Sequence, residues 1–418
     1  MSKFRLAYWS WALLIPMVLN AETVSAQILQ GIPRSPLETM AGSTERMPEG
    51  VYVMPWVATG VVYDDNVFFR PRSQRQDDVF LRVTPGLQAS YQSTPITVIG
   101  NYRFDSEVYN KFSNLDAVQQ RQFGTVELRG RPSNNLNLNG IVGYAQTHTP
   151  FELNFLTSVQ TARFKTERFF VNPSAEYRLD AKTRTTGEFG YSRDIFNNNV
   201  SIDSYILRGG LERRVSVHDW IGPAYLGRHF RFGGDFTTGT PGFIGGNPGA
   251  VDSYAIMASW SHEFTTDTRL DVRAGPRLTN GSLDDRPEAF VGIRRRIQNG
   301  EVTLAYTSAL TTVIGTVGAT RTDSVLVTFV YQPVRHLTLT LQPTAAWISN
   351  SVFTSTIYTG YVEAAYQFNK YVTAKGSAYF SYQDGDFTST GGATTTVIIP
   401  RNVYWLRLEF TYPTRWDY

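Results

Sequence analysis

Residues 79–91 read VFLRVTPGLQASY, and apolar and polar side chains alternate along this stretch. A side-chain period of two places the two kinds of residue on opposite faces of an extended strand. The apolar face comprises Val79, Leu81, Val83, Leu87 and Ala89, and the polar face comprises Arg82, Thr84, Gln88 and Ser90. In water the apolar face would need a second sheet or a helix to cover it. In a membrane the lipid covers it, so the pattern favours a transmembrane strand.

The same alternation recurs in many other segments, for example 269–278 and 336–347. These segments are rich in aromatic residues, of which the chain has 23 Tyr and 26 Phe. Beyond the N-terminus, no apolar run reaches the roughly 18 residues that a transmembrane helix needs. Helical periodicity is weak throughout. Together these features predict an all-β protein that crosses a membrane with strands.

The alternating segments divide the chain into roughly eighteen strands, and short turns alternate with longer loops between them. The predicted strands are 51–63, 78–91, 95–108, 120–131, 135–147, 161–179, 183–194, 203–214, 220–231, 252–264, 267–278, 287–298, 300–312, 322–332, 335–348, 356–368, 370–383 and 402–412. The longer loops are 64–77, 109–119, 148–160, 195–202, 232–251, 279–286, 313–321, 349–355 and 384–401. Outer-membrane barrels have short periplasmic turns and long outer loops. We therefore predict an antiparallel up-and-down β-barrel with both termini in the periplasm.

The N-terminal sequence indicates the cellular compartment of the protein. Lys3 and Arg5 precede an apolar stretch from Leu6 to Leu19, and Val24-Ser25-Ala26 is a small-residue cleavage site. We predict a signal peptide over 1–26, a periplasmic leader over 27–50 and the barrel over 51–418, in the cell outer membrane. The chain has no cysteine, so it carries neither disulfides nor a lipidated N-terminal cysteine.

The C-terminal strand alternates in the same way. Leu406, Leu408, Phe410 and Tyr412 share one face, an arrangement that resembles the terminal aromatic strand recognised by the barrel-assembly machinery. The residues from Pro413 to Tyr418 follow it. Whether Tyr412 or Tyr418 is the terminal assembly signal stays open at this point.

The sequence shows little sign of catalysis. The five histidines are scattered, with no spacing suited to a metal site. Asp64-Asp65-Asn66 could bind a cation through clustered oxygens, but Asp and Asn also favour strand ends, and we prefer that second interpretation. A net charge of +3 gives no reason to expect nucleic acid. We predict no enzyme activity, no cofactor and no metal.

The residues opposite the apolar faces predict the lining of the lumen. Cations outnumber anions among them: the cations are Arg82, Arg103, Arg129, Arg168, Arg178, Arg184, Arg208, Arg269, Arg273, Arg294, Arg296, Lys375 and Arg407, and the anions are Asp105, Glu107, Glu127, Glu176, Glu188, Glu212, Asp271, Glu363 and Glu409. Many opposite charges stand two residues apart in one strand. One interpretation is paired charges that brace the wall, and another is a charged constriction selecting anionic or sugar-rich solutes. Both can hold together.

Three consecutive arginines, 294–296, divide between the two faces of one strand. Arg294 and Arg296 fall on the predicted inner face, whereas Arg295 shares a face with Ile293 and Ile297. A charged side chain on the lipid face is costly at the midplane and nearly free at the interface. We therefore predict that Arg295 lies near a headgroup layer.

Two segments resemble a known family. YDDNVF at 63–68 and DVFLRVTPGL at 78–87 resemble the strand end and second strand of the type-2 β-barrel porins associated with bacterial exopolysaccharide biosynthesis and export clusters. The resemblance implies a part in polysaccharide production or export, without assigned catalytic residues.

These observations lead to a preferred function and two alternatives. The preferred one is an outer-membrane channel that acts as a conduit or accessory for exopolysaccharide export. The alternatives are a general small-solute diffusion porin and a structural surface barrel with a blocked lumen, for which the Gly-rich loop 232–251 is the first candidate plug. The expected partners are outer-membrane lipid and lipopolysaccharide, the barrel-assembly machinery and periplasmic polysaccharide-export proteins.

Overall fold

A computed structural model describes residues 50–416 except 155–156, 161–162, 197–199, 235–248, 284–285, 317, 351–352, 389–393 and 413. The predicted signal peptide, the leader before Gly50 and most of loop 232–251 therefore lie outside the described residues. The strands are β1 (Gly50–Asp64), β2 (Asp78–Gln92), β3 (Ile96–Tyr109), β4 (Ala117–Ser133), β5 (Leu136–Thr147), β6 (Thr166–Arg178), β7 (Thr183–Phe196), β8 (Val200–Arg214), β9 (Asp219–Gly233), β10 (Ala250–Thr265), β11 (Thr268–Gly275), β12 (Arg277–Thr279), β13 (Ser282–Leu283), β14 (Glu288–Ile297), β15 (Gly300–Thr312), β16 (Ala319–Val334), β17 (Leu337–Ser349), β18 (Phe353–Asn369), β19 (Val372–Thr388), β20 (Thr394–Thr411) and β21 (Thr414–Trp416). Three short 3-10 helices are η1 (Arg72–Gln74), η2 (Ser113–Leu115) and η3 (Pro150–Leu153).

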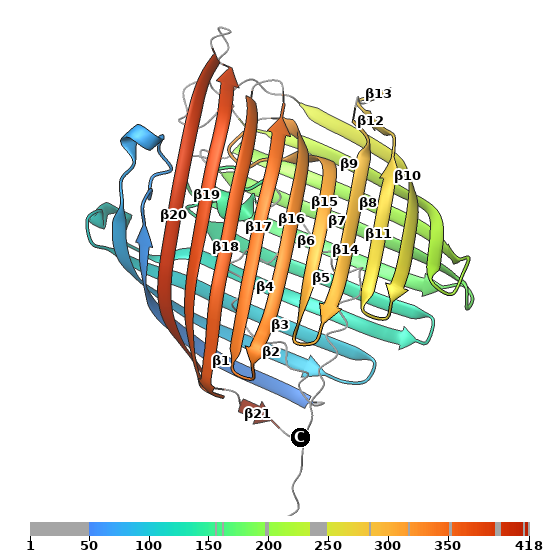
Figure 1. Cartoon of the computed structure of the whole chain (residues 1–418), viewed down its shortest axis with the longest axis horizontal. Coiled ribbons are helices and arrows are strands. Elements are labelled where there is room, and N and C mark those ends of the chain that lie inside the picture. Colours follow the sequence, from blue (N-terminus) through green and yellow to red (C-terminus); the bar gives the residue numbers. More distant parts are fainter. Residues whose placement is uncertain are drawn as a thin grey trace, which may run out of the picture.

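The strands form one closed antiparallel barrel. Consecutive barrel strands pair with one another, with β11 pairing with β14, and β1 pairs with β20 to complete the ring. β11 and β12 are one barrel strand interrupted at Pro276, because both pair with β10. β13 belongs to a small hairpin with β12, and β21 extends beyond β20, so the ring has the eighteen strands predicted from the sequence. Short turns gather at one end and longer connections at the other, which we call the turn end and the loop end (Figure 1).

The outer face of the barrel is apolar, as the alternation predicts. Val79, Leu81 and Leu87 are 40%, 46% and 44% exposed, and many other large apolar side chains on the same face are similarly exposed. No second sheet lies against this face in the described part of the chain. Within those residues no helix is long and apolar enough to cross a membrane. A closed ring of strands with an apolar outside and polar inside satisfies its backbone groups within lipid.

Most strand boundaries match the prediction within a few residues, but two regions differ. The prediction of a long loop at 384–401 was wrong, because β19 and β20 continue pairing as far as Thr388 and Thr394. The β-branched run Thr394 to Ile399 suits an extended strand and explains the extension. β6 begins at Thr166 rather than 161, so the connection before it is longer than expected.

The YDDN stretch fastens the seam between β1 and β20 at the loop end. The Arg401 guanidinium donates to both oxygens of Asp64 at 2.6–3.1 Å, and both side chains are buried. Asp65 accepts from the backbone and side chain of Asn402. Asn66 donates to the Pro400 carbonyl at 2.9 Å. These contacts commit the oxygens to closing the ring, which agrees with the strand-end interpretation rather than a cation site.

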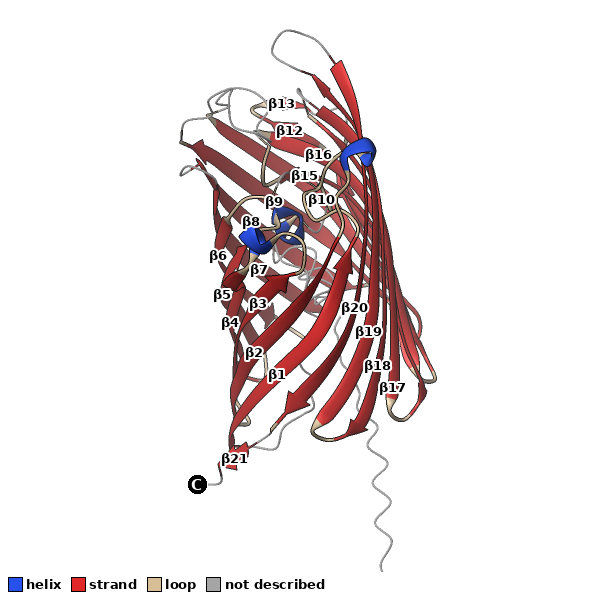
Figure 2. Cartoon of the chain, turned by 90° about the vertical axis from the view of Figure 1, so that its left-hand side faces the viewer, coloured by secondary structure: helices blue, strands red, loops and turns tan. Residues whose placement is uncertain are grey.

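β21 continues the last strand past Tyr412. Trp416 pairs with Val51 and Thr411 with Trp56, so five residues separate the two pairs on each strand and the register is unbroken. Figure 2 shows β1 and β20 side by side, with β21 at the turn end. Tyr412 is 64% exposed on the outer face. Residue 418 is not among those described, so the identity of the terminal assembly signal stays a sequence-based question.

Candidate channel lumen

The structure places the predicted lumen residues on the face opposite the exposed apolar side chains, and most of them form ion pairs. The shortest N–O distances are 2.7 Å for Arg82–Glu107, 2.6 Å for Arg129–Glu127, 3.5 Å for Arg178–Glu176, 3.4 Å for Arg208–Glu188, 3.0 Å for Arg269–Asp271, 2.6 Å for Arg294–Glu301 and 3.8 Å for Arg407–Glu363. The Arg129 and Arg178 side chains are 49% and 56% exposed near the turn end, so their pairs lie in solvent. Arg103 and Arg296 are half-buried on the same inner face.

Ion pairs between neighbouring strands hold the inner wall together. Asp105 stands two residues from Arg103 in its own strand, but it forms an ion pair with Arg121 of β4 at an N–O distance of 2.8 Å and lies 3.9 Å from Arg82 of β2. Residues two apart in a strand are separated by roughly 6.6 Å along its axis, whereas facing residues on adjacent strands are closer. Three same-strand pairs do form, Arg129–Glu127, Arg178–Glu176 and Arg269–Asp271, whereas the partner of Asp105 depends on cross-strand register, which spacing within one strand cannot predict.

Arg273 differs from the other predicted inner cations. It is half-buried on β11, and no carboxylate lies within 4.0 Å of it among the residues that the structure describes. Arg295, which follows Arg294 on β14, is exposed on the outer face and pairs in register with Thr268 beside the turn end. The two residues therefore provide a matched inner and outer cation on adjacent strands.

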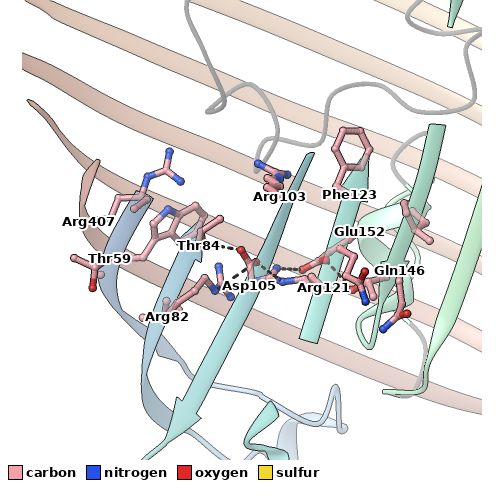
Figure 3. Close-up of a pocket in the computed structure, with 18 of the residues that line it drawn as sticks. Thr59, Arg82, Thr84, Arg103, Asp105, Arg121, Phe123, Gln146, Glu152 and Arg407 are labelled. Atoms are coloured by element: carbon pink, nitrogen blue, oxygen red, sulfur yellow. Dashed lines mark hydrogen bonds and ion pairs between the residues drawn. The ribbon is translucent and has the colours of Figure 1, made fainter. Parts of the chain in front are cut away.

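A buried ionic network occupies the wall formed by β2, β3 and β4 near the loop end (Figure 3). Arg121 contacts three carboxylates, those of Asp105, Glu107 and Glu152, at 2.8, 2.9 and 2.5 Å. Arg82 contacts Glu107 from the neighbouring strand at 2.7 Å. Asp105 and Glu107 each contact more than one cation, and Glu152 contacts Arg121. Charges out of water need such partners to offset their lost hydration.

Glu152 belongs to the β5–β6 connection, residues 148–165, which leaves the wall and enters the lumen. Its η3 turn is held to β4 by the Glu152–Arg121 pair. The Leu153 carbonyl accepts from Arg168 of β6 at 3.0 Å. Further along, the Gln160 backbone N–H donates to Gln383 of β19 at 2.7 Å. The connection therefore contacts strands on both sides of the β1–β20 seam rather than covering its own rim.

The β5–β6 connection meets a second inward segment, residues 313–318 between β15 and β16. These two connections start on roughly opposite sides of the ring. The Asn154 side chain donates to the Ile314 carbonyl at 3.1 Å and accepts from the Ile314 N–H at 2.8 Å. The pair closes a bridge across the lumen, and Asn154 is only 5% exposed.

Apolar side chains reinforce this bridge from both sides. Leu153 and Ile314 pack in a cluster with buried residues of β5 and β7–β10, among them Phe196 and Phe230. Val159 and Val313 pack in a second cluster with the inner wall of β17 and β18. Both clusters lie where a wide aqueous pore would otherwise run. The two segments together therefore narrow the loop end of the lumen, the role predicted for loop 232–251, whose residues 235–248 are not described.

A cavity lies beneath the inserted segment, against the inner wall from β20 to β5 (Figure 3). Its empty volume is about 780 Å³, part of it open to solvent. Arg103 and Arg407 line it together with Phe123, and both arginines were predicted from the sequence. Trp56 packs against the wall nearby, and a Cβ at Gly86 would overlap its indole ring, which explains the glycine of the TPG stretch.

Sequence reasoning missed several residues of this site. Arg121 lies in the predicted strand 120–131, on the same face as Glu127 and Arg129, but the predicted lining omitted it. Glu152, Asn154 and Ile314 fall in predicted loops. A carboxylate and an amide in a loop carry no signal that distinguishes a solvated tip from an inserted segment. The apolar content of 313–314 was the one available indication that this loop is buried.

The described residues offer no group of three or more His, Asp or Glu side chains suited to a metal ion. Two histidine–carboxylate contacts, His229–Asp252 at 2.8 Å and His262–Asp219 at 2.7 Å, lie on the outer face near opposite ends of the barrel. In the second, Ser216 donates to Asp219 rather than to the histidine, so no nucleophile–base pair forms there.

The chain shows only distant similarity to known proteins. No protein-family model matches the chain, and no curated protein matches it. Solved structures similar to it include the siderophore receptor PirA from Pseudomonas aeruginosa, with a TM-score of 0.44, 8% identity, and coverage of 88% of this chain and 81% of that one. Another is OccK8 (OprE) from the same organism, with a TM-score of 0.40, 11% identity, and coverage of 87% and 98%. The closed ring, apolar outside and charged inside define an outer-membrane-type β-barrel with a porin-like fold.

Proposed function

We propose that this protein is an outer-membrane channel that serves as a conduit for an exopolysaccharide. The observation that carries the proposal is the inner face, where hydroxyls, carboxylates and an excess of arginines line a lumen of eighteen strands. Barrels of this size leave an aqueous channel when nothing fills them. The resemblance of 63–68 and 78–87 to porins of exopolysaccharide clusters supports the choice of cargo.

The proposal includes a closed and an open form. The Asn154–Ile314 bridge and its two apolar clusters narrow the loop end, so passage of a polymer requires the inserted segments to move. Partners on the periplasmic side, such as polysaccharide-export proteins, could supply the energy for that movement. The signal peptide expected over 1–26 directs the chain out of the cytoplasm, and the expected leader over 27–50 lies in the periplasm.

The test of the channel is conductance of the purified protein in planar bilayers. An inner wall with more cations than anions lowers the barrier for anions, so we expect chloride to pass in preference to potassium. Arg273→Glu should reduce or reverse that preference, whereas Arg295→Glu on the outer face should leave it unchanged. An unchanged preference in Arg273→Glu would contradict the assigned lining.

A structural barrel with a blocked lumen is the second candidate, and the inserted segments favour it specifically. This candidate predicts no conductance in the wild type or in variants that loosen the bridge. The conduit predicts conductance at least in the loosened variants. Conductance recordings on the wild type and on the loosened variants therefore distinguish the conduit from the blocked barrel.

A further inference from the structure

The cavity beneath the inserted segment contains a guanidinium whose hydrogen bonds are incomplete. The Nε and Nη2 atoms of Arg407 are shielded from solvent and have no hydrogen-bond acceptor among the residues that the structure describes. The nearest carboxylate oxygen, Oε2 of Glu363, is 3.8 Å from Nη2. That oxygen already accepts from the Tyr361 hydroxyl at 2.9 Å and from Ser377 at 3.1 Å. Buried donors normally find a partner, so an unfilled one indicates a place for an acceptor.

The acids that line the cavity cannot supply that acceptor. Asp105 is engaged by Arg121 at 2.8 Å and by the Thr84 hydroxyl at 2.6 Å. Glu152 is engaged by Arg121 at 2.5 Å and by Thr147 at 2.9 Å. The cavity therefore has carboxylates that are already neutralised and at least one arginine with unfilled donors. The charge balance of the cavity therefore favours binding of an anion.

Arg103 and Phe123 form the opposite part of the lining. The Arg103 guanidinium carbon lies 5.5 Å from the centroid of the Phe123 ring. In Figure 3 the head groups of Arg103 and Arg407 stand at the side of the cavity away from the network around Arg121. An arginine, a second arginine and an aromatic ring provide an anion site beside an apolar surface. Sugars with an acidic group present those two features together.

We infer that this cavity is a binding subsite for a carboxylate-bearing sugar, with Arg407 as the main anion ligand and Arg103 as the second. Arginine recognises carboxylates through two parallel N–H···O bonds. The cavity is partly open to solvent, so a sugar can approach its arginines from the lumen. The inference rests on the proposed conduit function, because it names the chemistry of the cargo.

Isothermal titration of the folded protein in detergent micelles tests the subsite without requiring transport. The probes are D-glucuronate, D-glucose of the same ring size, and inorganic phosphate. We expect glucuronate to bind, glucose to bind at least about tenfold more weakly, and phosphate to bind more weakly than glucuronate. Equal binding of glucose would contradict an anion subsite, and phosphate binding as tight as glucuronate would contradict one built for a sugar.

Variants locate the binding within the barrel. Arg407→Gln should weaken glucuronate binding at least about tenfold, whereas Arg295→Gln on the outer face should not change it. Glu363→Gln removes the competing carboxylate beside Arg407 and should tighten binding, a direction that a purely structural role does not predict. Heat-modifiable migration in gels confirms that each variant is folded. Unchanged affinity in Arg407→Gln, or no glucuronate binding by the wild type, would overturn the inference.

Failure of the subsite and failure of the conduit are distinguishable. Binding of glucuronate that depends on Arg407, in cells whose polysaccharide secretion does not depend on this protein, would keep the subsite and reject the conduit. Secretion that depends on the protein, without glucuronate binding, would keep the conduit and reject the subsite.

Discussion

Asn154 and Ile314 are 160 residues apart in the chain, yet the Asn154 side chain both donates to and accepts from the Ile314 backbone. The two residues belong to connections that start on roughly opposite sides of the ring. A single buried amide thus joins two inward segments across the lumen. Because the bridge uses few hydrogen bonds, small changes at Asn154 should alter passage without unfolding the wall.

Asn154→Leu should raise the mean conductance of the barrel in planar bilayers. Leucine has a similar volume but leaves the Ile314 N–H and carbonyl without partners, at a cost of about 1–3 kcal/mol to the closed arrangement. Asn134→Leu, at an exposed turn-end position, is the control and should conduct like the wild type. Equal conductance of Asn154→Leu and the wild type would show that the bridge does not restrict the lumen.

Arg121→Gln should destabilise the barrel by about 3–5 kcal/mol, because it leaves Asp105, Glu107 and Glu152 buried with their shared cation removed. Arg129→Gln should cost less than about 1 kcal/mol, since the Arg129 pair is exposed. Urea unfolding of the refolded barrel in lipid vesicles measures both. Similar losses for the two variants would contradict the assignment of Arg121 as the centre of the network.

The strands could be predicted from the sequence, whereas the contents of the lumen could not. Alternation such as that of residues 79–91 is local, and lipid on one side with water on the other imposes it along every strand. The partners of Arg121 and Asn154 are set by cross-strand register and by contacts between distant loops, which leave no local pattern. Loop 232–251 was chosen as the candidate plug for its glycines, and its residues 235–248 lie outside the described part of the chain. The described parts of 148–165 and 313–318 narrow the lumen through apolar packing and one amide.

Leu81→Arg should destabilise the barrel by about 2–4 kcal/mol if the side chain lies near the midplane of the bilayer. Thr340→Arg, on the inner face opposite Glu363 in register, should be tolerated because water and a carboxylate are available there. Thr84 is less suitable for this comparison, since it is 8% exposed and donates to Asp105. Equal sensitivity at Leu81 and Thr340 would contradict the assignment of the two faces.

Epitope tags placed in the loop-end connection 389–393 should be accessible to antibody on intact cells. Tags in the Asp180–Lys182 turn or next to Asn369 should become accessible only after the outer membrane is permeabilised. Labelling of the turns on sealed cells would reverse the orientation and place the inserted segments in the periplasm.

The most direct test of the conduit is the amount of polysaccharide secreted by cells that lack this protein. The account predicts that deletion lowers secreted polymer, that the wild-type gene restores it, and that uptake of small nutrients stays unchanged throughout. Undiminished secretion together with reduced uptake of small solutes would contradict the conduit and identify the protein as a diffusion porin.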